Sequence, residues 1–301
     1  MIRLVGLYRE KEYSPGRHQS NDTLLLEAVA GRLRASGCHV ELTTIDRTER
    51  PPKALIFSMC QGRAALDRLL EWERAGAQIV NSPRAALNTY RDRLPALLAS
   101  AGVPFPQTEL ISTNGHGPMR GADRIARDRS VPPTLVSTRA PASDGGFWLK
   151  RGDVHASVSR DVQWIDSLEA FETGCAEFRS RGIATAAVQA HRAGDEIKFY
   201  GVAGGAFFHW FYSGASREQP FDRSALPRLA AEAAHAAGLD VFGGDVIVSP
   251  SGELTLIDLN DWPSFAPCRE TAADAIANHL TRRAHAAWNR GLVPSANQSA
   301  L

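Results

Sequence analysis

Two apolar segments, each with an acidic residue in its middle, constrain the fold of this chain more than any other feature of its sequence. Val241–Val248 and Glu253–Leu259 have the composition of β-strands, and the intervening SPSG predicts a hairpin turn. Asp245 and Asp258 lie among apolar neighbours in these segments. Because a carboxylate in an apolar strand is costly unless it is paired or bound to a metal, the hairpin predicts an ion pair or a metal site.

The turn length sets which side chains share a face of this hairpin. With a four-residue turn, Asp245 lies opposite Leu256, and the alternation of side chains puts three polar residues on one face: Asp245, Asp258 and Asn260. Two carboxylates and an amide oxygen suit Mg²⁺ and leave positions for substrate phosphates. The alternative is a pair of carboxylates that face arginines, and the pattern alone leaves both open.

Lysine is rare in this chain. Lys and Arg together number 34, and only four of these are lysines: Lys11, Lys53, Lys150 and Lys198. Lys150 closes the apolar segment FWLK, and Lys198 lies within EIKFYGV. Each by itself is typical of an edge residue whose stem packs on the strand. Beside a candidate Mg²⁺ site, the two together indicate point charges for a polyphosphate.

The first 80 residues alternate between strand and helix patterns. Strands are predicted over 2–7, 40–45, 54–58 and 78–80, and helices over 22–36 and 62–75. This alternation indicates a small parallel sheet with ligand access at the carboxyl ends of its strands. Beyond it, helices are predicted over 84–90, 91–101, 167–181, 222–237 and 271–289, and strands over 147–150, 162–165, 186–191, 196–202 and 205–212. The Gly- and Pro-rich stretch 112–146 is expected to be a surface insertion, and the class is α/β (α+β).

Composition excludes several classes of function. The chain has 34 basic and 33 acidic side chains, which argues against binding nucleic acid or a membrane surface through broad positive charge. It has no leader-like start, no apolar run approaching ~18 residues and no CxxC among its four cysteines. We expect a cytoplasmic protein with free thiols. P-loop and GxGxxG motifs are absent from the sequence.

Four segments occur in a characteristic order between Asn81 and Phe265: NSPRAAL…RDRLPALLASAGVPFPQT, FWLK, VQAHRAGDEIKFYGV and GLDVFGGDVIV…LTLIDLNDWPSF. In this order they resemble the ATP-grasp superfamily, which includes D-alanine–D-alanine ligase, glutathione synthetase and the glutamate ligases that modify ribosomal protein. The resemblance implies a Rossmann-like pre-ATP-grasp domain over 1–80 and a two-lobed ATP-grasp module over 81–292. Within the module it implies a nucleotide-clamping lobe over 147–202 and a metal-binding lobe over 203–292, followed by a tail over 293–301.

The resemblance also implies roles for individual residues. Lys150 would contact the α- and β-phosphates of ATP, and Lys198 would reach the γ-phosphate as a catalytic residue. The remaining nucleotide contacts would be the hinge backbone of Gln189, Ala190 and His191, which contacts adenine, and Glu196, which contacts the ribose. Two Mg²⁺ ions would be held by Asp245, Asp258 and Asn260. Arg217 is the candidate that orients the substrate carboxylate, and further candidate substrate contacts are Tyr13, Arg17 and Arg223.

Three features depart from the pattern of the ligases. Arg93 stands where many relatives have lysine, Asp258 replaces a glutamate, and the segment RGDVHASVSRD after Lys150 contains one glycine where many ligases have a Gly-rich flap. An Asp-x-Asn pair and a Gly-poor segment also occur in the ATP-grasp inositol polyphosphate kinases. A basic pocket for such a substrate could come from Arg120, Arg124, Arg127 and Arg129, which equally fit a solvated surface.

These observations favour an ATP- and Mg²⁺-dependent ligase that joins a carboxylate to an amine, or less readily a thiol, through an acyl phosphate. The alternative is a small-molecule kinase of the inositol polyphosphate kinase type. A silent nucleotide-binding module is disfavoured because the lysines and the acidic set are all present. The expected partners are small-molecule carboxylate and amine substrates and, in a homodimer, a second copy of the chain. Neither nucleic acid nor a membrane is expected as a partner.

Overall fold

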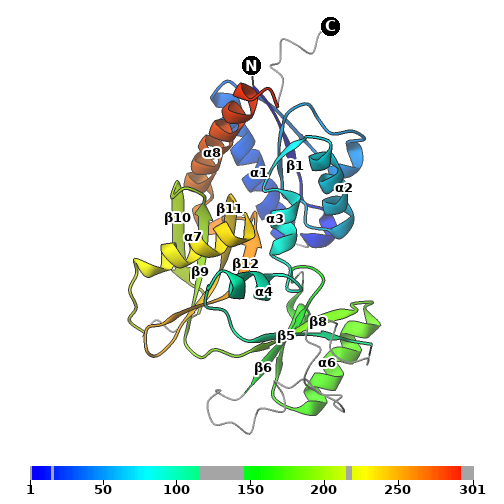
Figure 1. The fold of residues 1–301 in the computed structure, drawn as a ribbon, viewed down its shortest axis with the longest axis vertical. Coiled ribbons are helices and arrows are strands. Elements are labelled where there is room, and N and C mark those ends of the chain that lie inside the picture. Colours follow the sequence, from blue (N-terminus) through cyan, green and yellow to red (C-terminus); the bar gives the residue numbers. More distant parts are fainter. Residues whose placement is uncertain (1, 15–16, 115–145, 157, 215–218, 293–301) are drawn as a thin grey trace.

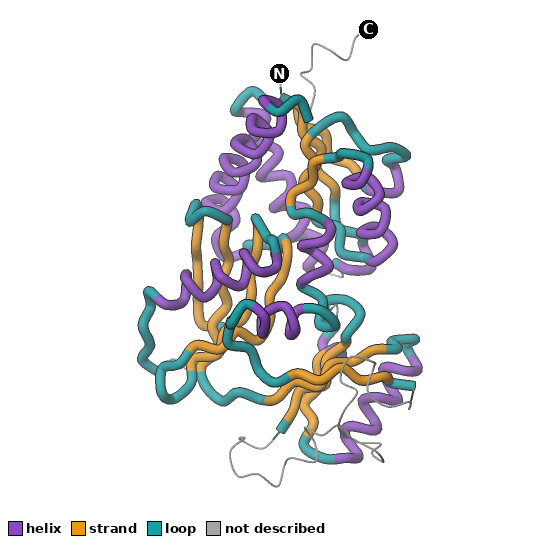
Figure 2. The backbone as a smooth tube through the Cα atoms, viewed as in Figure 1, coloured by secondary structure: helices purple, strands orange, loops and turns teal. Residues whose placement is uncertain are grey.

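The computed structural model describes residues 2–14, 17–114, 146–156, 158–214 and 219–292 (Figure 1). Three four-stranded sheets form its framework (Figure 2). The N-terminal sheet is parallel, with the order β2-β1-β3-β4. Its strands are β1 (Arg3–Leu7), β2 (His39–Thr43), β3 (Leu55–Ser58) and β4 (Gln78–Val80), and its helices are α1 (Arg17–Ala35) and α2 (Arg63–Arg74). The predicted alternation of the first 80 residues is confirmed, although α1 begins five residues before the expected start.

Two antiparallel sheets follow. The central sheet has the order β5-β8-β6-β7 and the C-terminal sheet has the order β10-β9-β11-β12. The central strands are β5 (Thr108–Ser112), β6 (Phe147–Arg151), β7 (Val162–Ile165) and β8 (Thr185–Ala190). The C-terminal strands are β9 (Asp195–Val202), β10 (Phe207–Tyr212), β11 (Val241–Val248) and β12 (Leu254–Asp261). The other helices are α3 (Pro83–Asn88), α4 (Leu94–Ser100), α6 (Leu168–Ser180), α7 (Ala225–Ala237) and α8 (Arg269–Asn289).

One helix covers one face of each antiparallel sheet. Phe171 and Phe178 of α6 pack on Leu149 of the central sheet. In the same way α7 lies across the C-terminal sheet and packs on Ile197 and Phe199 of β9 (Figure 1). The opposite face of the C-terminal sheet carries Lys198, and its Tyr200 and Val202 pack in the core around α8. Among the described helices, none combines the length and apolar character needed to cross a membrane.

The β11–β12 hairpin differs from the predicted register in two places. Its loop has five residues, because Val248 pairs with Leu254 rather than with Glu253. A register shift between Asp245 and Val246 then inserts one extra residue, Ile257, into β12. Asp245 consequently lies opposite Asp258, and the expectation that it lies opposite Leu256 is wrong.

Strand β5 is a second difference. The sequence predicts no element over the segment TELIS, which follows a proline-rich stretch, but it pairs along the edge of the central sheet with β8. A short edge strand of mixed polarity has no apolar alternation of its own, so the partner strand determines its structure. The expected insertion over 112–146 lies largely outside the described residues.

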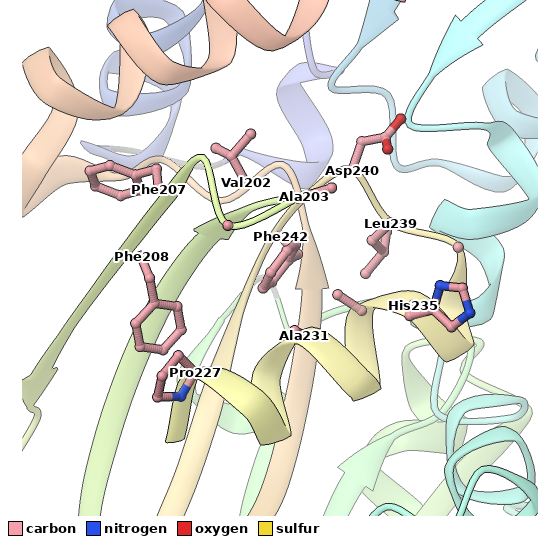
Figure 3. A pocket seen from close by; sticks show the side chains of 14 residues that line it. Val202, Ala203, Phe207, Phe208, Pro227, Ala231, His235, Leu239, Asp240 and Phe242 are labelled. Carbon is pink, nitrogen blue, oxygen red and sulfur yellow. The ribbon is translucent and has the colours of Figure 1, made fainter. Parts of the chain in front are cut away.

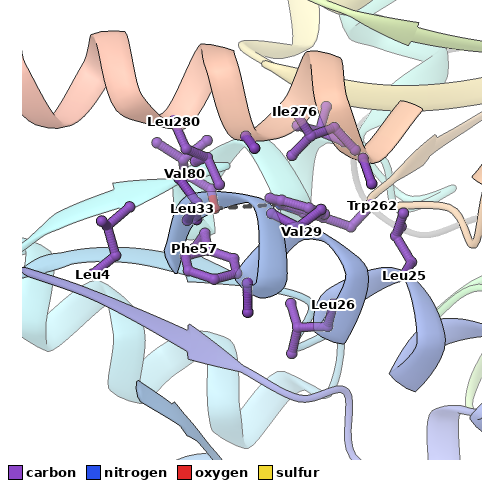
Figure 4. Close-up of a cluster of buried hydrophobic side chains, with 14 of the residues drawn as sticks. Leu4, Leu25, Leu26, Val29, Leu33, Phe57, Val80, Trp262, Ile276 and Leu280 are labelled. Carbon is purple, nitrogen blue, oxygen red and sulfur yellow. Dashed lines mark hydrogen bonds between the residues drawn. The ribbon is translucent and has the colours of Figure 1, made fainter. Parts of the chain in front are cut away.

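One core joins the two ends of the chain. α8 packs against α1, and Trp262, which follows β12, is buried between them and the N-terminal sheet (Figure 4). The indole Nε1 of Trp262 donates to the carbonyl of Val80 over 3.3 Å. The end of β12 is thereby held against the N-terminal sheet. The domain limits expected from the sequence remain a prediction.

A single buried asparagine fixes the start of β11. Asn81 Oδ1 accepts from the amides of Asp240, over 2.7 Å, and Val241, over 2.9 Å. Its Nδ2 donates to the carbonyl of Val241 over 2.7 Å. Asn81 is only 3% exposed, so water does not replace these bonds. It ties the first residue of β11 to the segment that follows β4.

Asn81→Ala should therefore destabilise the fold by roughly 2–4 kcal/mol, because it leaves buried backbone groups without partners. Asn88→Ala is the matched control, since Asn88 donates one bond of 3.1 Å to the carbonyl of Ala237. It should cost about 1 kcal/mol. Urea unfolding at neutral pH measures both, and equal losses would contradict the role given to Asn81.

Candidate active site

The face of the C-terminal sheet opposite α7 carries two cross-strand rows of side chains. The lysine row runs from β10 to β12 and consists of Phe211, Lys198, Asp245 and Asp258. The tyrosine row lies beside it and consists of His209, Tyr200, Gly243 and Asn260. Directly opposite residues in a ladder share a face, so the predicted grouping of Asp245, Asp258 and Asn260 on one face is confirmed.

Lys198 is the cation of the lysine row. Its Nζ lies 2.8 Å from Asp245 Oδ1 and 3.5 Å from Glu196 Oε1. Burial acts to lower the pKa of Lys198, but the two carboxylates raise it above its ordinary value. Burial also raises the pKa of Asp245, against the opposing effect of Lys198. Lys198 therefore stays charged across the neutral range and stabilises a carboxylate that is costly to ionise.

Asp258 is balanced by an arginine from outside the sheet. Arg91 Nη2 lies 3.1 Å from Asp258 Oδ2, and Arg91 Nη1 donates to the carbonyl of Arg151 over 3.1 Å. Burial acts to raise the pKa of Asp258, but Arg91, Lys150 and His155 hold it below its ordinary value. Of the two environments that the sequence left open for these carboxylates, Asp258 has the one in which a carboxylate faces an arginine. The sequence did not identify this arginine, and only the RDR segment, which also contains Arg93, could have suggested it.

Lys150 lies between the central and C-terminal sheets. It lines a narrow cavity of about 10 Å³ with Arg91, Gln189 and Asp258, and it is 7% exposed. Within the described part of the chain, its ammonium group makes no hydrogen bond or ion pair. Burial lowers its pKa to about 8, although Asp258 acts in the opposite direction. A buried cation without a direct partner is costly, so this cavity is suited to an anion.

The hinge residues lie at the end of β8, beside this cavity. Gln189 Nε2 donates to the carbonyl of Ile257 over 3.4 Å and so links the two sheets. The amide of Ala190 donates to the Gln107 carbonyl over 2.9 Å, and the amide of His191 to the Gly146 carbonyl over 3.3 Å. Both amides are thus engaged within the protein. The adenine contact expected of this hinge remains a prediction.

The Gly-poor segment after Lys150 is anchored to the N-terminal half. Val154 is buried in the core beneath α2 and α3. His155 Nε2 lies 2.7 Å from Thr89 Oγ1, and its burial lowers the pKa to about 4. This histidine is therefore neutral and packed. Anchoring explains how the segment dispenses with glycines.

Several expected substrate contacts do not gather at this site. Arg223 stacks over Trp210, with its guanidinium carbon 5.7 Å from the ring centroid, on the α7 face. The sheet separates it from the lysine row, and its expected substrate contact remains a prediction. Tyr13 lies against Gly62 beside the N-terminal sheet, and Arg17 begins α1. Arg217 and the four arginines of the insertion, Arg120, Arg124, Arg127 and Arg129, lie outside the described residues.

The oxygen donors of the two rows fit a hard divalent cation. Asp245 and Asp258 face each other, and Asn260 lies one row away on the same strand as Asp258. Among the described residues, no group of three or more His, Cys, Asp or Glu side chains is arranged to hold a metal. A Mg²⁺ ion here would therefore need the Asn260 amide and ligand phosphates to complete its oxygen shell.

Comparisons with known proteins bear on the fold of the chain. No known protein family and no curated protein matches the sequence. A RimK-domain ATP-grasp protein from Sphaerobacter thermophilus matches with 14% identity and a TM-score of 0.64, over 93% of this chain and 99% of that one. The D-alanine–D-alanine ligase from Coxiella burnetii matches with 12% identity and a TM-score of 0.65, over 97% and 100%. The ATP-grasp ligase PsnB, in complex with a precursor peptide and AMPPNP, matches with 17% identity and a TM-score of 0.59, over 94% and 97%.

The chain has the ATP-grasp fold. The resemblance drawn from the sequence is confirmed at the level of fold, including the N-terminal sheet that precedes the two antiparallel sheets.

A larger cavity of this ATP-grasp chain lies away from the lysine row. It has a volume of about 930 Å³ and lies between α7, the turn after β9 and the start of β11 (Figure 3). Its lining is mostly apolar, and its two titratable side chains are His235 and Asp240. Asp240 already contacts Arg283 over 3.3 Å. Cavity size therefore does not identify the active site, because this cavity contains none of the predicted site residues.

The affinity for Mg-ATP should fall as the pH rises above about 8, because Lys150 then loses its proton and its charge-assisted contact. The contact is worth ~1.5–3 kcal/mol, so we expect a loss of roughly 10- to 100-fold. In Lys150→Arg the guanidinium stays charged, and this fall should disappear. Calorimetric titration between pH 6.5 and 9.5 measures both proteins. The same pH dependence in both would contradict the assignment.

Asp258→Asn should destabilise the free protein by roughly 2–4 kcal/mol at pH 7, because it leaves Arg91 buried without its carboxylate. The pKa of Asp258 is lowered in the folded state, so its contribution is present at neutral pH. The contribution is lost as the pH falls below the ordinary value of 3.8, where the two proteins should converge. Asp245→Asn is the control and should cost about 1 kcal/mol or less, because burial already disfavours that charge. Thermal melting across pH measures both losses of stability. A larger loss for Asp245→Asn than for Asp258→Asn would contradict this prediction.

Proposed function

We propose that this protein is an ATP- and Mg²⁺-dependent ligase that joins a carboxylate to an amine through an acyl phosphate. The observation that carries the proposal is the buried Lys150, which has no hydrogen bond or ion pair among the described residues and faces the acidic end of the lysine row between the sheets. A buried cation in this position is suited to contact the phosphates of a nucleotide. The solved structures of PsnB, which hold AMPPNP or Mg and ADP, support this choice of ligand.

The predicted site residues would contact different parts of the nucleotide, according to their positions on the two sheets. Lys150 would neutralise the α- and β-phosphates from the central sheet, and Lys198 would neutralise the transferred γ-phosphoryl group from β9. Glu196, 41% exposed and two residues before Lys198, would contact the ribose. Catalysis then depends on placing the phosphoryl group beside the acceptor and on balancing its charge.

Asp245, Asp258 and Asn260 would hold Mg²⁺. The resemblance to the ATP-grasp ligases implies two ions. When bound, the cation would supply charge neutralisation for the phosphates. Before any cation binds, Lys198 and Arg91 neutralise the two carboxylates. We infer that Lys198 turns from Asp245 toward the γ-phosphate when the nucleotide is bound.

The ligase and the kinase differ in the product of phosphoryl transfer. An acyl phosphate is a mixed anhydride that hydroxylamine captures as a hydroxamate, whereas a phosphate ester resists hydroxylamine. ATP turnover is first screened over amino acids, dipeptides and inositol phosphates, with ADP release as the measurement. Products formed with and without hydroxylamine are then weighed by mass spectrometry. We expect a hydroxamate in stoichiometric amount with ADP, and a stable phosphorylated product would instead establish the kinase.

A further inference from the structure

The proposed direction of the nucleotide along β9 indicates where the acceptor would lie. Glu196, Lys198 and Tyr200 alternate with buried residues on one face of the strand. Successive side chains on one face are ~6.6–6.8 Å apart. If the ribose lies at Glu196 and the γ-phosphate at Lys198, as the proposed function has it, the next position is Tyr200. The tyrosine row is therefore the part of the sheet that meets the acceptor and the attacking nucleophile.

Tyr200 is held firmly in this row. Its ring centroid lies 5.0 Å from that of Phe265 and 5.9 Å from that of Phe211. Gly243, its neighbour on β11, has no room for a Cβ atom, which would lie 2.9 Å from the Tyr200 ring and 2.8 Å from Pro263. The row is thus a closely packed wall with a fixed surface.

His209 lies at the open end of this wall. It is directly opposite Tyr200, on β10, the edge strand of the sheet. The imidazole is half-buried and touches the Phe211 ring, with centroids 6.1 Å apart. Neither of its ring nitrogens has a hydrogen-bond partner among the described residues. A nitrogen lone pair is therefore available to a ligand, one strand away from Lys198.

The other titratable groups on this face are already engaged or hold their proton. The carboxylates all contact cations: Glu196 and Asp245 contact Lys198, and Asp258 contacts Arg91. Burial raises the pKa of Tyr200 above its ordinary value, although Lys198 acts to lower it, so the phenol stays protonated at neutral pH. Among the described residues of the two rows, His209 is the side chain with a basic nitrogen and no hydrogen-bond or ion-pair partner.

We propose that His209 is the general base of the ligation step, and this proposal rests on the proposed function. An amine reaches the site as an ammonium ion, which has no lone pair for attack. His209 takes one ammonium proton, and the freed lone pair forms the C–N bond at the acyl carbon. The C–O bond to phosphate breaks, and its electron pair leaves with inorganic phosphate. The second amine proton passes to solvent, and the imidazolium of His209 then returns its proton to solvent.

Hydroxylamine separates this step from the formation of the acyl phosphate. It is unprotonated at neutral pH and needs no base, whereas an alkylamine does. In His209→Gln, ligation of the amine should fall by roughly 100-fold or more, because general-base catalysis contributes about 10²–10⁴-fold. ADP release with hydroxylamine should stay within about threefold of the wild-type rate. The carboxylate substrate in both reactions is the compound that gives the fastest ADP release in the screen of candidate substrates.

Two further proteins complete the experiment. His235→Gln is the matched control, because His235 is an exposed histidine on α7, and it should leave both reactions unchanged. In His209→Ala, added imidazole should restore part of the amine ligation, and thermal melting checks that the variant folds. Equal losses with amine and with hydroxylamine, or an absence of rescue in a folded His209→Ala, would overturn the base. A wild-type protein that forms no hydroxamate would instead refute the ligase itself.

Discussion

Two carboxylates that face each other across β11 and β12 determine much of what surrounds them. Asp245 and Asp258 lie on a sheet whose other face is an apolar core, so neither can be ionised without a nearby cation. Each cation comes from a different part of the chain: Lys198 from β9, Arg91 from the segment before α4 and Lys150 from the central sheet. The charge balance of the hairpin therefore draws three separate segments to one place.

The same hairpin is fixed at its ends by neutral contacts. Asn81 holds the first residue of β11, and the buried Trp262 holds the end of β12 against the N-terminal sheet. Both contacts are far from the charges they help to position. A site built on two strands of a sheet, with both strand ends tied to a second sheet, keeps its carboxylates in place without a bound ligand.

The two rows separate the chemical roles across the sheet. Toward β12 the lysine row is acidic and suits a cation and phosphates, whereas toward β10 both rows end in ring side chains, Phe211 and His209. The described residues at that end include no cluster of cations of the kind a polyphosphate acceptor would need.

Local sequence determined the elements and the chemistry of the candidate site, but not its geometry. Alternation and turn residues were sufficient for the N-terminal sheet and for most helices, while β5 was missed because its pairing with β8 depends on a distant strand. Two arginines in RDR are indistinguishable by sequence, and only folding shows that Arg91 reaches Asp258. The sequence did not single out His209 either, because its position opposite Tyr200 depends on the pairing of β10 with β9.

The hairpin shows most clearly where the sequence was enough and where it was not. Its loop is one residue longer than predicted, which by itself would have turned Asp258 toward α7. The extra residue Ile257 restores the alternation, so Leu256 enters the apolar core while Asp258 faces the site. The sequence determined that Asp258 and Leu256 have opposite solvation demands, but the predicted regular alternation put both on one face. Tertiary packing decided where the extra residue lies in β12. Only the core beneath α7 and the cations on the other side of the sheet could set the position of this bulge.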